Sequence, residues 1–404
     1  MKNQSKKIRI DVVEKYFYPV MAGIEVNIME TYSVLVKQGF DVTIHTSRDT
    51  LTEKNILSDT DLVKGIKVRR YAFKSDNFGY LPQIDWQNTD LVCLHNFNVF
   101  YFWILLYCLW LKLTGRKNFA LVLTPHGGFN PEWSIFSLWT RVKKEIYQYT
   151  VGSILINLVV DAVRAVSEWE RKEIIKMGVA RNKVITISNG IEDEAYQDID
   201  KQASLEIKKT VKHLGRYIIQ VGRVYPIKNY ETSIKALVKM PVDLKYVIVG
   251  PIQEDEKNKY YKKGLDDLIS NLHLQDRVKF LGVVKGIDKF YLIKHAQMMV
   301  HMAIWESFCN VVHEGLSQGL ICLVANNTAL PLLIKDGING YCIETHNFDA
   351  LAEKINYVLE NKNSKYFQDM SNRNKKVGRE TRWSNVAKKM RQLYLSLLNH
   401  DQKY

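Results

Sequence analysis

Cysteine is scarce in this sequence, and its spacing lacks the pairs that disulfide frameworks and zinc sites use. The 404 residues include five cysteines, an odd number, and none of them forms a Cys-x-x-Cys pair. This pattern predicts neither a metal site nor a disulfide framework, and it favours a reducing compartment. The start of the chain also lacks a signal peptide, because the polar, basic segment 1–9 leads directly into Ile10–Val13. We therefore expect a cytoplasmic protein. The five cysteines are Cys93, Cys108, Cys309, Cys322 and Cys342.

The sequence also lacks an apolar run long enough to span a membrane. The longest run, Val99–Leu111, has thirteen residues, whereas crossing a bilayer takes about twenty. A buried crossover helix is the favoured interpretation. Lys112, Arg116 and Lys117 follow at once, which keeps an interfacial membrane helix open as the alternative.

Positive charge, by contrast, is abundant. The formal net charge is +14, and residues 101–150 hold six Lys and Arg against two Asp and Glu, together with many aromatic residues. A basic surface attracts phosphorylated ligands, anionic lipid or nucleic acid. The alternative explanation of the positive charge is that all proteins of the source organism are rich in lysine, so that the charge has no binding role. No zinc spacing or aromatic RNA-binding motif occurs, so we do not expect nucleic acid as a partner.

The first half of the sequence alternates between strand and helix patterns. A helix is expected to open at Ala22-Gly23 and to end at Gly39, and Ser167 is expected to cap a helix over 168–177. Strand, glycine turn, helix and strand in this order predict a doubly wound α/β domain. The predicted strands are 7–13, 41–45, 66–71 at an edge, 90–95 in the centre, 119–124, 162–166 and 183–188.

The same alternation starts again after a polar segment. Residues 195–214 are polar and charged, so we place the domain linker there. Asn229 is expected to cap a helix that runs to Met240, and the last predicted helix is Trp383–Leu398. The length fits two domains, and the chain is predicted to be two α/β units in series. The other predicted elements are strands 217–221, 245–249, 278–281, 298–301 and 320–324, and helices 260–272 and 287–295.

The stretch Trp305–Gly319 is the leading candidate for a ligand site. It has two carboxylates eight positions apart, Glu306 before a predicted helix and Glu314 within it. The start of a helix attracts phosphate, because its first N–H groups have no intrahelical partner. Glu306 would lie beside that anion, and Glu314 would accept hydrogen bonds from a sugar or ribose diol. The alternative is a solvent-exposed helix that carries two acids.

Three further side chains are expected at the carboxyl ends of strands, where this architecture binds ligands. His126 follows the strand 119–124 between Pro125 and Gly127, although a lone histidine can also be structural. Arg223 and Lys228 follow the first strand of the second half. Arginine as a bidentate fork and lysine as a point charge suit a diphosphate, and the alternative is an ordinary basic loop.

Taken together, these motifs resemble the retaining glycosyltransferases of family 4 (glycosyl transferases group 1), and the resemblance covers nearly the whole chain. The most specific are Val221-Gly222-Arg223 with Lys228 and the pair Glu306 and Glu314, and the least specific is the glycine turn at Ala22-Gly23. The motifs are Ala22-Gly23-Ile24-Glu25, Thr124-Pro125-His126-Gly127, Ser167-Glu168-Trp169-Glu170, Asn189-Gly190-Ile191, Val221-Gly222-Arg223 with Lys228, and the pair Glu306 and Glu314.

The resemblance implies a GT-B fold, in which two Rossmann-like doubly wound α/β domains face a central cleft. Residues 1–195 would form the acceptor-binding domain and residues 196–380 the nucleotide-sugar-binding domain. Residues 381–404 would be a C-terminal helix that crosses back to the first domain.

The resemblance also implies roles for individual residues. In this family the arginine and lysine hold the donor diphosphate, which implies Arg223 and Lys228 here. The first acid contacts the transferred sugar and the second the ribose, which implies Glu306 and Glu314. His126 would line the sugar site, so the implied catalytic set is His126, Glu306, Arg223 and Lys228. The implied substrate-binding residues are Gly23, Asn189, Gly222, Arg223, Lys228, Glu306, Phe308, Cys309, Asn310 and Glu314.

Three positions depart from the family pattern. The usual Gly-Gly turn is Ala22-Gly23, the glycine common after the lysine is Asn229, and a glycine common in the acid loop is Cys309. The first change adds a methyl group where an acceptor would approach the backbone closely, and the last narrows the space beside the donor sugar. None removes a charged group, so we expect activity.

The function implied is metal-independent transfer of a sugar from a UDP- or GDP-linked donor to an acceptor hydroxyl, with retention. The sequence shows no carboxylate nucleophile near His126, which favours a front-face route in which the leaving diphosphate takes the acceptor proton. No cofactor is expected. The expected acceptor is a lipid-linked or cell-surface glycan precursor, reached from the inner face of the cytoplasmic membrane, and a soluble acceptor is the alternative. A nucleotide-sugar epimerase of the same fold and a non-catalytic nucleotide-sugar binder are the rival functions.

Overall fold

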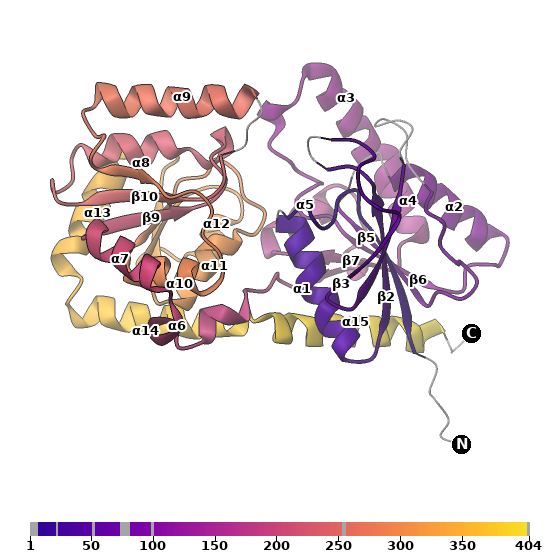
Figure 1. Ribbon diagram of the computed structural model, residues 1–404. Helices are drawn as coiled ribbons and strands as arrows, with labels where there is room; N and C mark the ends of the chain where they lie inside the picture. Colours follow the sequence, from indigo (N-terminus) through magenta and orange to yellow (C-terminus); the bar gives the residue numbers. More distant parts are fainter. Residues whose placement is uncertain are drawn as a thin grey trace. The chain divides into compact units, whose positions relative to one another are not determined.

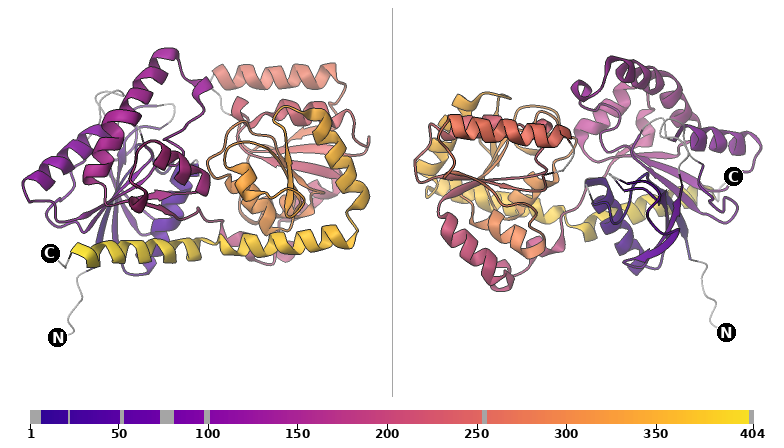
Figure 2. Two further views of the ribbon diagram at one scale, coloured as in Figure 1. Left: turned by 180° about the vertical axis from the view of Figure 1, so that it is seen from behind. Right: turned by 45° about the horizontal axis from the view of Figure 1, so that its top comes forward.

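A computed structural model of the chain describes residues 7–21, 23–50, 53–72, 81–97, 101–252 and 256–401. The chain divides into two units. Unit 1 is Met1–Gly190 with Trp383–Tyr404, and unit 2 is Ile191–Arg382. Each unit contains its own sheet, with helices on both faces (Figures 1 and 2).

The sheet of unit 1 has eight strands in the order β3-β4-β2-β1-β5-β6-β7-β8. All neighbours are parallel except β3 and β4. The central strands are buried along their length, as expected for a parallel sheet that helices cover on both faces. The strands are β1 (Arg9–Val13), β2 (Asp41–Ser47), β3 (Thr60–Val63), β4 (Ile66–Tyr71), β5 (Leu91–His95), β6 (Ala120–Thr124), β7 (Ala162–Ala165) and β8 (Val184–Thr186).

The helices of unit 1 enclose one apolar core on each face of this sheet. The long helix α15 belongs to unit 1 although it ends the chain, and it packs on α1. Its buried residues Trp383, Met390 and Tyr394 join the core that contains Ile28 and Tyr32 of α1. The helices are α1 (Gly23–Lys37), α2 (Phe102–Leu113), α3 (Leu138–Ile146), α4 (Ser153–Val159), α5 (Glu168–Lys176) and α15 (Trp383–Asp401), with a π-helical turn at Tyr147–Gly152 between α3 and α4.

Gly190 packs against the start of α15. A β-carbon at this position would lie 2.3 Å from the indole of Trp383, closer than any real contact. The absence of a side chain therefore lets the Trp383 ring lie directly on the backbone. This contact explains the glycine of the Asn189-Gly190-Ile191 motif by packing alone.

The sheet of unit 2 has six strands in the order β11-β10-β9-β12-β13-β14, and all its paired strands are parallel. This order is that of the dinucleotide-binding folds, in which the chain reverses its direction of winding between the two central strands. Here the switch lies between β9 and β12. The strands are β9 (Tyr217–Val221), β10 (Lys245–Val249), β11 (Val278–Phe280), β12 (Met299–His301), β13 (Cys322–Ala325) and β14 (Gly340–Ile343).

A single large core joins the strands of unit 2 to its helices. Asn374 of α14, fully buried, donates to the backbone of Leu320 and of Asn339, and so ties this helix to the sheet. The helices are α6 (Ile199–Gln202), α7 (Leu205–Leu214), α8 (Tyr230–Leu237), α9 (Glu256–Asn271), α10 (Gly286–His295), α11 (Asn310–Ser317), α12 (Leu330–Leu333), α13 (Phe348–Asn361) and α14 (Lys365–Glu380).

The predicted linker at 195–214 was wrong. The segment contains α6 and α7, both within unit 2, and Ser204 caps α7 by accepting from the amide of Ile207. The helix is polar because it buries only one side, through Ile207 and Leu214. The chain passes between the units at Gly190–Ile191 and again at Arg382–Trp383.

Other expectations about single elements also need correction. The segment 66–71 is not an edge strand, because β3 pairs with its outer side. Asn229 does not cap α8 through its side chain, and α8 ends at Leu237 rather than Met240. The helix expected at 99–111 is described from Tyr101 onward and is only half buried, since Trp103, Trp110 and Leu113 of α2 are exposed.

Candidate functional site

The centre of the site in unit 2 is an ion pair between Lys228 and Glu306. Lys228 follows β9 and Glu306 follows β12, so the pair lies at the switch point of the sheet. The ammonium of Lys228 contacts Oε1 of Glu306, and Nε2 of His301 lies 2.8 Å from the same oxygen. Oε1 of Glu306 therefore links the loop after β9 to the end of β12, the two central strands of unit 2.

Two hydrogen bonds to backbone carbonyls hold the loop of Lys228 and the loop of Glu306 together. The amide of Ile304 donates to the carbonyl of Ile227 at 2.9 Å. Nδ2 of Asn229 donates to the carbonyl of Met302 at 2.9 Å. Asn229 has a left-handed backbone (φ +50°), a conformation that asparagine tolerates better than most residues. Its side chain thus adds a link between the loops.

Glu306 is ionised in this environment. Burial alone raises its pKa, but the charge of Lys228 and the hydrogen bond from His301 outweigh burial and lower the pKa from 4.5 to about 2. Burial also lowers the pKa of His301, so its ring is neutral at pH 7 and donates from Nε2. The site therefore presents a fixed negative charge with a fixed ammonium beside it.

These residues also gather potential metal ligands. Atoms of His301, Glu306 and Cys309 lie within 4.8 Å of one another. However, Oε1 of Glu306 already accepts from both Lys228 and His301. A cation at this point would compete with the ammonium for the same oxygen. Metal independence itself stays a prediction.

Helix α11 begins at Asn310, directly after this cluster, so Glu306 precedes the helix and Glu314 lies within it, as the sequence predicted. Cys309, at the N-cap position, is buried and has a left-handed backbone (φ +66°). Glycine adopts this conformation without strain, whereas a residue with a β-carbon does not. Phe308 is buried and stacks on His313 with 4.1 Å between ring centroids. Substrate-binding roles for Phe308, Cys309 and Asn310 stay predictions.

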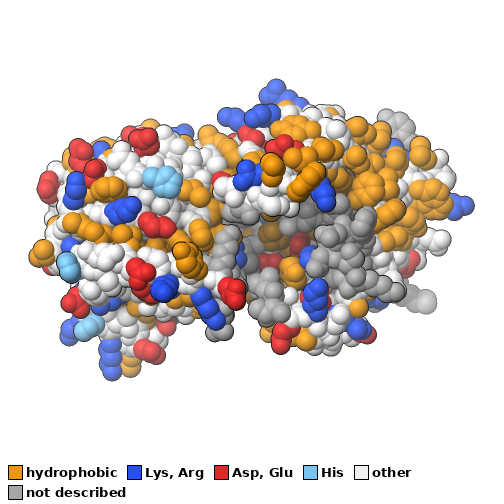
Figure 3. All heavy atoms as spheres, turned by 90° about the horizontal axis from the view of Figure 1, so that it is seen from above, with side chains coloured by type: hydrophobic (Ala, Val, Ile, Leu, Met, Phe, Trp, Pro, Cys, Tyr) orange, Lys and Arg blue, Asp and Glu red, His pale blue; other side chains and the backbone are white. Residues whose placement is uncertain are grey.

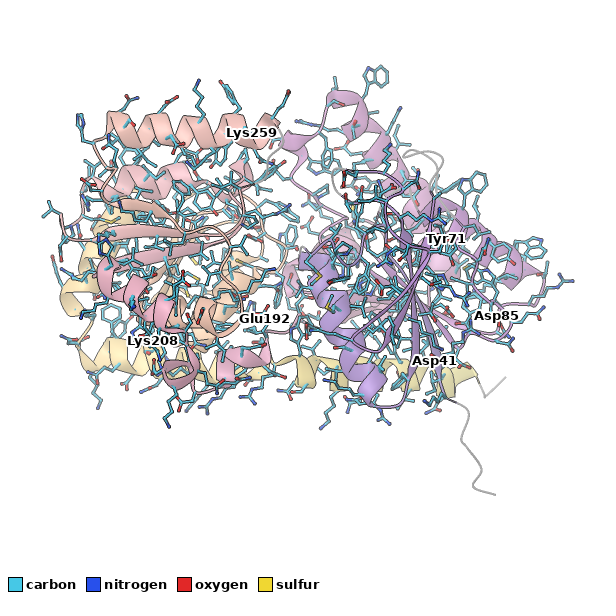
Figure 4. The ribbon with its side chains drawn as sticks, in the orientation of Figure 1. Asp41, Tyr71, Asp85, Glu192, Lys208 and Lys259 are labelled. Carbon is cyan, nitrogen blue, oxygen red and sulfur yellow. The ribbon has the colours of Figure 1, made fainter. Side chains whose placement is uncertain are left out.

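Glu314 lies in α11 and takes part in a second ion-pair cluster. Its Oε1 is 3.1 Å from Nζ of Lys289 on α10, and this ammonium also binds Glu192 at 2.7 Å. Figure 4 labels Glu192 on the ribbon of unit 2. The other oxygen of Glu314, Oε2, is buried and has no hydrogen-bond partner among the described residues. It is therefore a buried acceptor that no described residue satisfies.

Arg223 is exposed and follows the same strand as Lys228. Its guanidinium forms no ion pair or hydrogen bond within the described part of the chain, so nothing there occupies its donors. The methylenes of Lys228 pass 3.7 and 3.8 Å from the point where a β-carbon of Gly222 would lie. The turn Gly222-Arg223 is therefore adjacent to the ion pair, and the hydroxyl of Tyr230 fixes it by donating to the carbonyl of Gly222 at 2.8 Å.

In unit 1, His126 belongs to a chain of buried hydrogen bonds. Its Nε2 lies 2.9 Å from Nδ1 of His95, whose Nε2 lies 2.9 Å from the hydroxyl of Tyr32. Tyr32 in turn contacts the hydroxyl of Tyr394 on α15 at 3.1 Å. Burial, with a smaller contribution from Arg164, lowers the pKa of His126 to about 3. His126 is thus a neutral, oriented ring whose Nδ1 has no partner among the described residues.

The carboxylate of Glu170 fixes the backbone of the loop that carries His126. One carboxylate oxygen accepts from the amide of Gly127 and the other from the amide of Val166 at 2.6 Å. Burial raises the pKa of Glu170 to about 7 in spite of these bonds. The acid of the predicted Ser-Glu-Trp-Glu motif therefore shapes the backbone at His126, which is left-handed (φ +52°).

The two remaining predicted residues differ in their surroundings. A β-carbon on Gly23 would meet nothing within 4 Å, so open space lies beside the start of α1. Ala22 lies outside the described residues. Oδ1 of Asn189 accepts from Nδ2 of Asn27 at 2.5 Å and from Arg164 at 3.2 Å. These contacts give Asn189 a role within unit 1, and its substrate role stays a prediction.

Sequence reasoning missed His95, His301 and Lys289. His95 and His301 end β5 and β12, so the rule that singled out His126 at a strand end applies to both. Lys289 had no comparable signal, because it lies in the middle of α10 and meets Glu314 only through tertiary packing.

Two family models match the chain. The model of "Glycosyl transferases group 1" matches residues 202–377, and that of "Glycosyltransferase Family 4" matches residues 21–195. The first match spans both ion-pair clusters apart from Glu192. The second spans the loop of His126 and the helix that begins at Gly23.

Individual relatives are distant. N-acetyl-alpha-D-glucosaminyl L-malate synthase of Bacillus anthracis is 23% identical over 60% of this chain and 61% of its own length. GDP-mannose:cellobiosyl-diphosphopolyprenol alpha-mannosyltransferase of Xanthomonas oryzae pv. oryzae is 22% identical over 85% of both chains. This chain thus spans about three fifths of the length of the Bacillus anthracis relative.

A solved structure shares the fold. The crystal structure of Anabaena Alr3699/HepE in complex with UDP superposes with a TM-score of 0.74 at 18% identity, over 96% of this chain and 100% of that chain. This likeness confirms the predicted GT-B architecture, with two Rossmann-like parallel-sheet domains. Among the described residues, no helix has the length and apolar character that a membrane crossing requires.

Proposed function

The chain belongs to the GT-B glycosyltransferases of family 4, glycosyl transferases group 1, and we propose that it moves a sugar from a nucleoside diphosphate sugar to an acceptor hydroxyl with retention of configuration. The observation that carries the proposal is the Lys228–Glu306 pair at the switch point of unit 2. Ligands of open α/β sheets bind at this point, outside the carboxyl ends of the strands.

The polar groups around the pair support a diphosphate-linked sugar as its ligand. Lys228, the unpaired guanidinium of Arg223 and the start of α11 provide positive charge and N–H donors for two phosphates. Glu306 provides an acceptor for sugar hydroxyls. Oε2 of Glu314, a buried acceptor without a partner among the described residues, would accept from the ribose.

The proposed reaction is a front-face displacement. The bond between the anomeric carbon and the diphosphate oxygen breaks first, through an oxocarbenium-like transition state. The acceptor oxygen then bonds to the same face, and its proton passes to the leaving diphosphate. Negative charge grows on that diphosphate, so Arg223, Lys228 and the N-terminus of α11 stabilise the transition state more than the ground state. Neutral His126 would line the sugar site.

We extend the proposal to a lipid-linked glycan precursor as the acceptor and to polysaccharide or glycan biosynthesis as the setting, on the cytoplasmic side of the membrane. The relative from Xanthomonas oryzae pv. oryzae, whose name specifies a diphosphopolyprenol acceptor, supports this class. We propose no resident cofactor and no metal, since Lys228 supplies the positive charge that a cation would otherwise provide.

The test is a donor screen with the full chain. UDP-, GDP- and dTDP-linked sugars are incubated with and without a polyprenol diphosphate glycan, and release of the nucleoside diphosphate is followed with and without a chelator. The expected result is release from one donor, stimulated by the acceptor and insensitive to chelation. NMR of the product is expected to show the anomeric configuration of the donor.

Variants then connect the activity to the site. Arg223→Ala and Glu306→Ala are expected to lose about a hundredfold or more in kcat/KM while staying folded. Lys209→Ala, on the exposed surface of α7, is the control. Wild-type rates in both site variants would refute the assignment. Sugar interconversion without an acceptor would indicate an epimerase, and donor binding without turnover a non-catalytic binder.

A further inference from the structure

One face of unit 1 exposes an unusual number of large apolar side chains. Helix α3 has no buried residue at all. Its Leu138 and Trp139 are 74% and 76% exposed, and Ile146 is 60% exposed. Leu138, Val142 and Ile146 recur every four residues, so they lie along one side of the helix. This helix is amphipathic, yet its apolar side faces solvent.

Neighbouring elements extend this surface. The π-helical turn continues α3 directly into α4, and α4 packs against α2. We call the exposed apolar side chains of these elements the α2–α4 face. Figure 3 shows hydrophobic side chains gathered on this part of unit 1. The members of the face are Trp103, Trp110, Leu113, Leu138, Trp139, Val142, Ile146, Tyr149, Val151, Ile154 and Leu158.

Cations border the face, and two of them lie over aromatic rings of the same segment. The guanidinium of Arg116 lies 5.6 Å from the ring centroid of Trp110, and the ammonium of Lys144 lies 4.9 Å from that of Phe136. Lys112 donates to the carbonyl of Leu158, which places its charge between α2 and α4. Lys143 is exposed and forms no ion pair among the described residues. Residues 101–150 contain six cations and two acids.

An open apolar hollow adjoins α2. Leu81, Trp103, Leu106 and Tyr107 line it, and its volume is about 470 Å³. Three tryptophans and a tyrosine of the face combine an apolar ring with a polar N–H or O–H group. Such side chains concentrate at the boundary between hydrocarbon and water.

We propose that the α2–α4 face binds the surface of an anionic lipid bilayer, with α3 lying in the interface. Membrane anchoring without a spanning segment requires two signals, buried apolar area and a basic border, and this face has both. A protein partner would satisfy the apolar side chains equally well, but the excess of cations over acids in residues 101–150 favours a surface of negative lipid headgroups. The inference is independent of the proposed sugar transfer, because binding is measured without donor or acceptor.

The experiment is co-sedimentation of the full chain with phosphatidylcholine vesicles, with and without phosphatidylglycerol. The wild-type protein is expected to bind the anionic vesicles and to bind the neutral ones much more weakly. Lys143→Ala is expected to weaken binding about fivefold, since one cation near an anionic surface contributes roughly a factor of that size. Trp139→Ala is expected to weaken binding roughly tenfold or more.

Two matched controls lie in unit 2. Lys209→Ala removes an exposed lysine from α7, and Tyr260→Ala removes an aromatic ring that is 81% exposed on α9. Both are expected to bind vesicles like the wild type. All four positions are exposed, so each variant is expected to fold.

Three outcomes would overturn the proposal. The first is equal failure to bind both kinds of vesicle. The second is equal binding of all four variants. The third is a dimer in sedimentation velocity that Trp139→Ala dissociates, because the face would then be covered by a second copy of the chain.

Discussion

The Lys228–Glu306 pair allows stability and catalysis to be tested separately. Glu306 has its pKa lowered from 4.5 to about 2 by Lys228 and His301, against the opposing effect of burial. At about 1.4 kcal/mol per pH unit, the ionised carboxylate contributes about 3 kcal/mol to folding at neutral pH. This contribution is complete above pH 4.5, and it is lost as the pH falls from there toward 2. Lys228→Gln removes the main partner and leaves a buried charge, so a loss of about 3 kcal/mol is expected.

The assay is a double-variant cycle with Lys228→Gln, Glu306→Gln and both together. Each single variant is expected to lower the melting temperature of unit 2 by about 6 to 12 °C. The double variant is expected to recover much of this loss, because no buried charge is then left without a partner. Arg216→Gln, which breaks an exposed ion pair with Asp243 at 2.8 Å, is the control and is expected to cost under about 1 kcal/mol.

Transfer is expected to behave differently from stability. All three variants at the pair should lose about a hundredfold or more in kcat/KM, and the double variant should not recover activity. Recovery of transfer together with stability would mean that Lys228 is only a structural partner of Glu306. Losses of stability that simply add in the double variant would show that the two side chains are not coupled, and the reasoning from the pKa would be wrong.

Three further predictions concern single positions. His95→Asn removes the ring that orients the histidine of the His-Gly loop, and kcat in a steady-state assay is expected to fall about tenfold or more; an unchanged kcat would contradict this role. Cys309→Gly is expected to be about 1 kcal/mol more stable than Cys309→Ala in denaturant titrations, because only glycine relieves the left-handed backbone (φ +66°); equal midpoints would show that the loop is not strained. Gly190→Ala would place a β-carbon 2.3 Å from Trp383, so calorimetry is expected to show a loss of about 1–3 kcal/mol, while Gly23→Ala, with open space around it, is expected to melt like the wild type.

The alternation of apolar strands with capped helices determined the two α/β units and most of their elements. Short-range signals such as Ser167 before α5 and Gly39 after α1 were sufficient, because they act within one turn of the chain. The position of Lys228 after a strand predicted its place at the edge of the sheet where parallel strands end, and the ion pair with Glu306 was found only in the structure. The same logic placed His126 at a strand end, and it would also have found His95 and His301.

Tertiary structure alone decided the rest. The polar sequence of 195–214 predicted a linker, but a helix that buries only Ile207 and Leu214 looks equally polar, and only packing on unit 2 distinguishes the two. Lys289 reaches Glu314 from another helix, so no spacing in the chain could reveal their pairing. The apolar run of α2 predicted a buried helix, yet one side of α2 is exposed. Hydrophobicity alone does not specify which sides of a helix its neighbours cover. Local patterns therefore determined the elements and the strand-end residues, whereas contacts between distant segments decided which charges are paired and which apolar surface remains exposed.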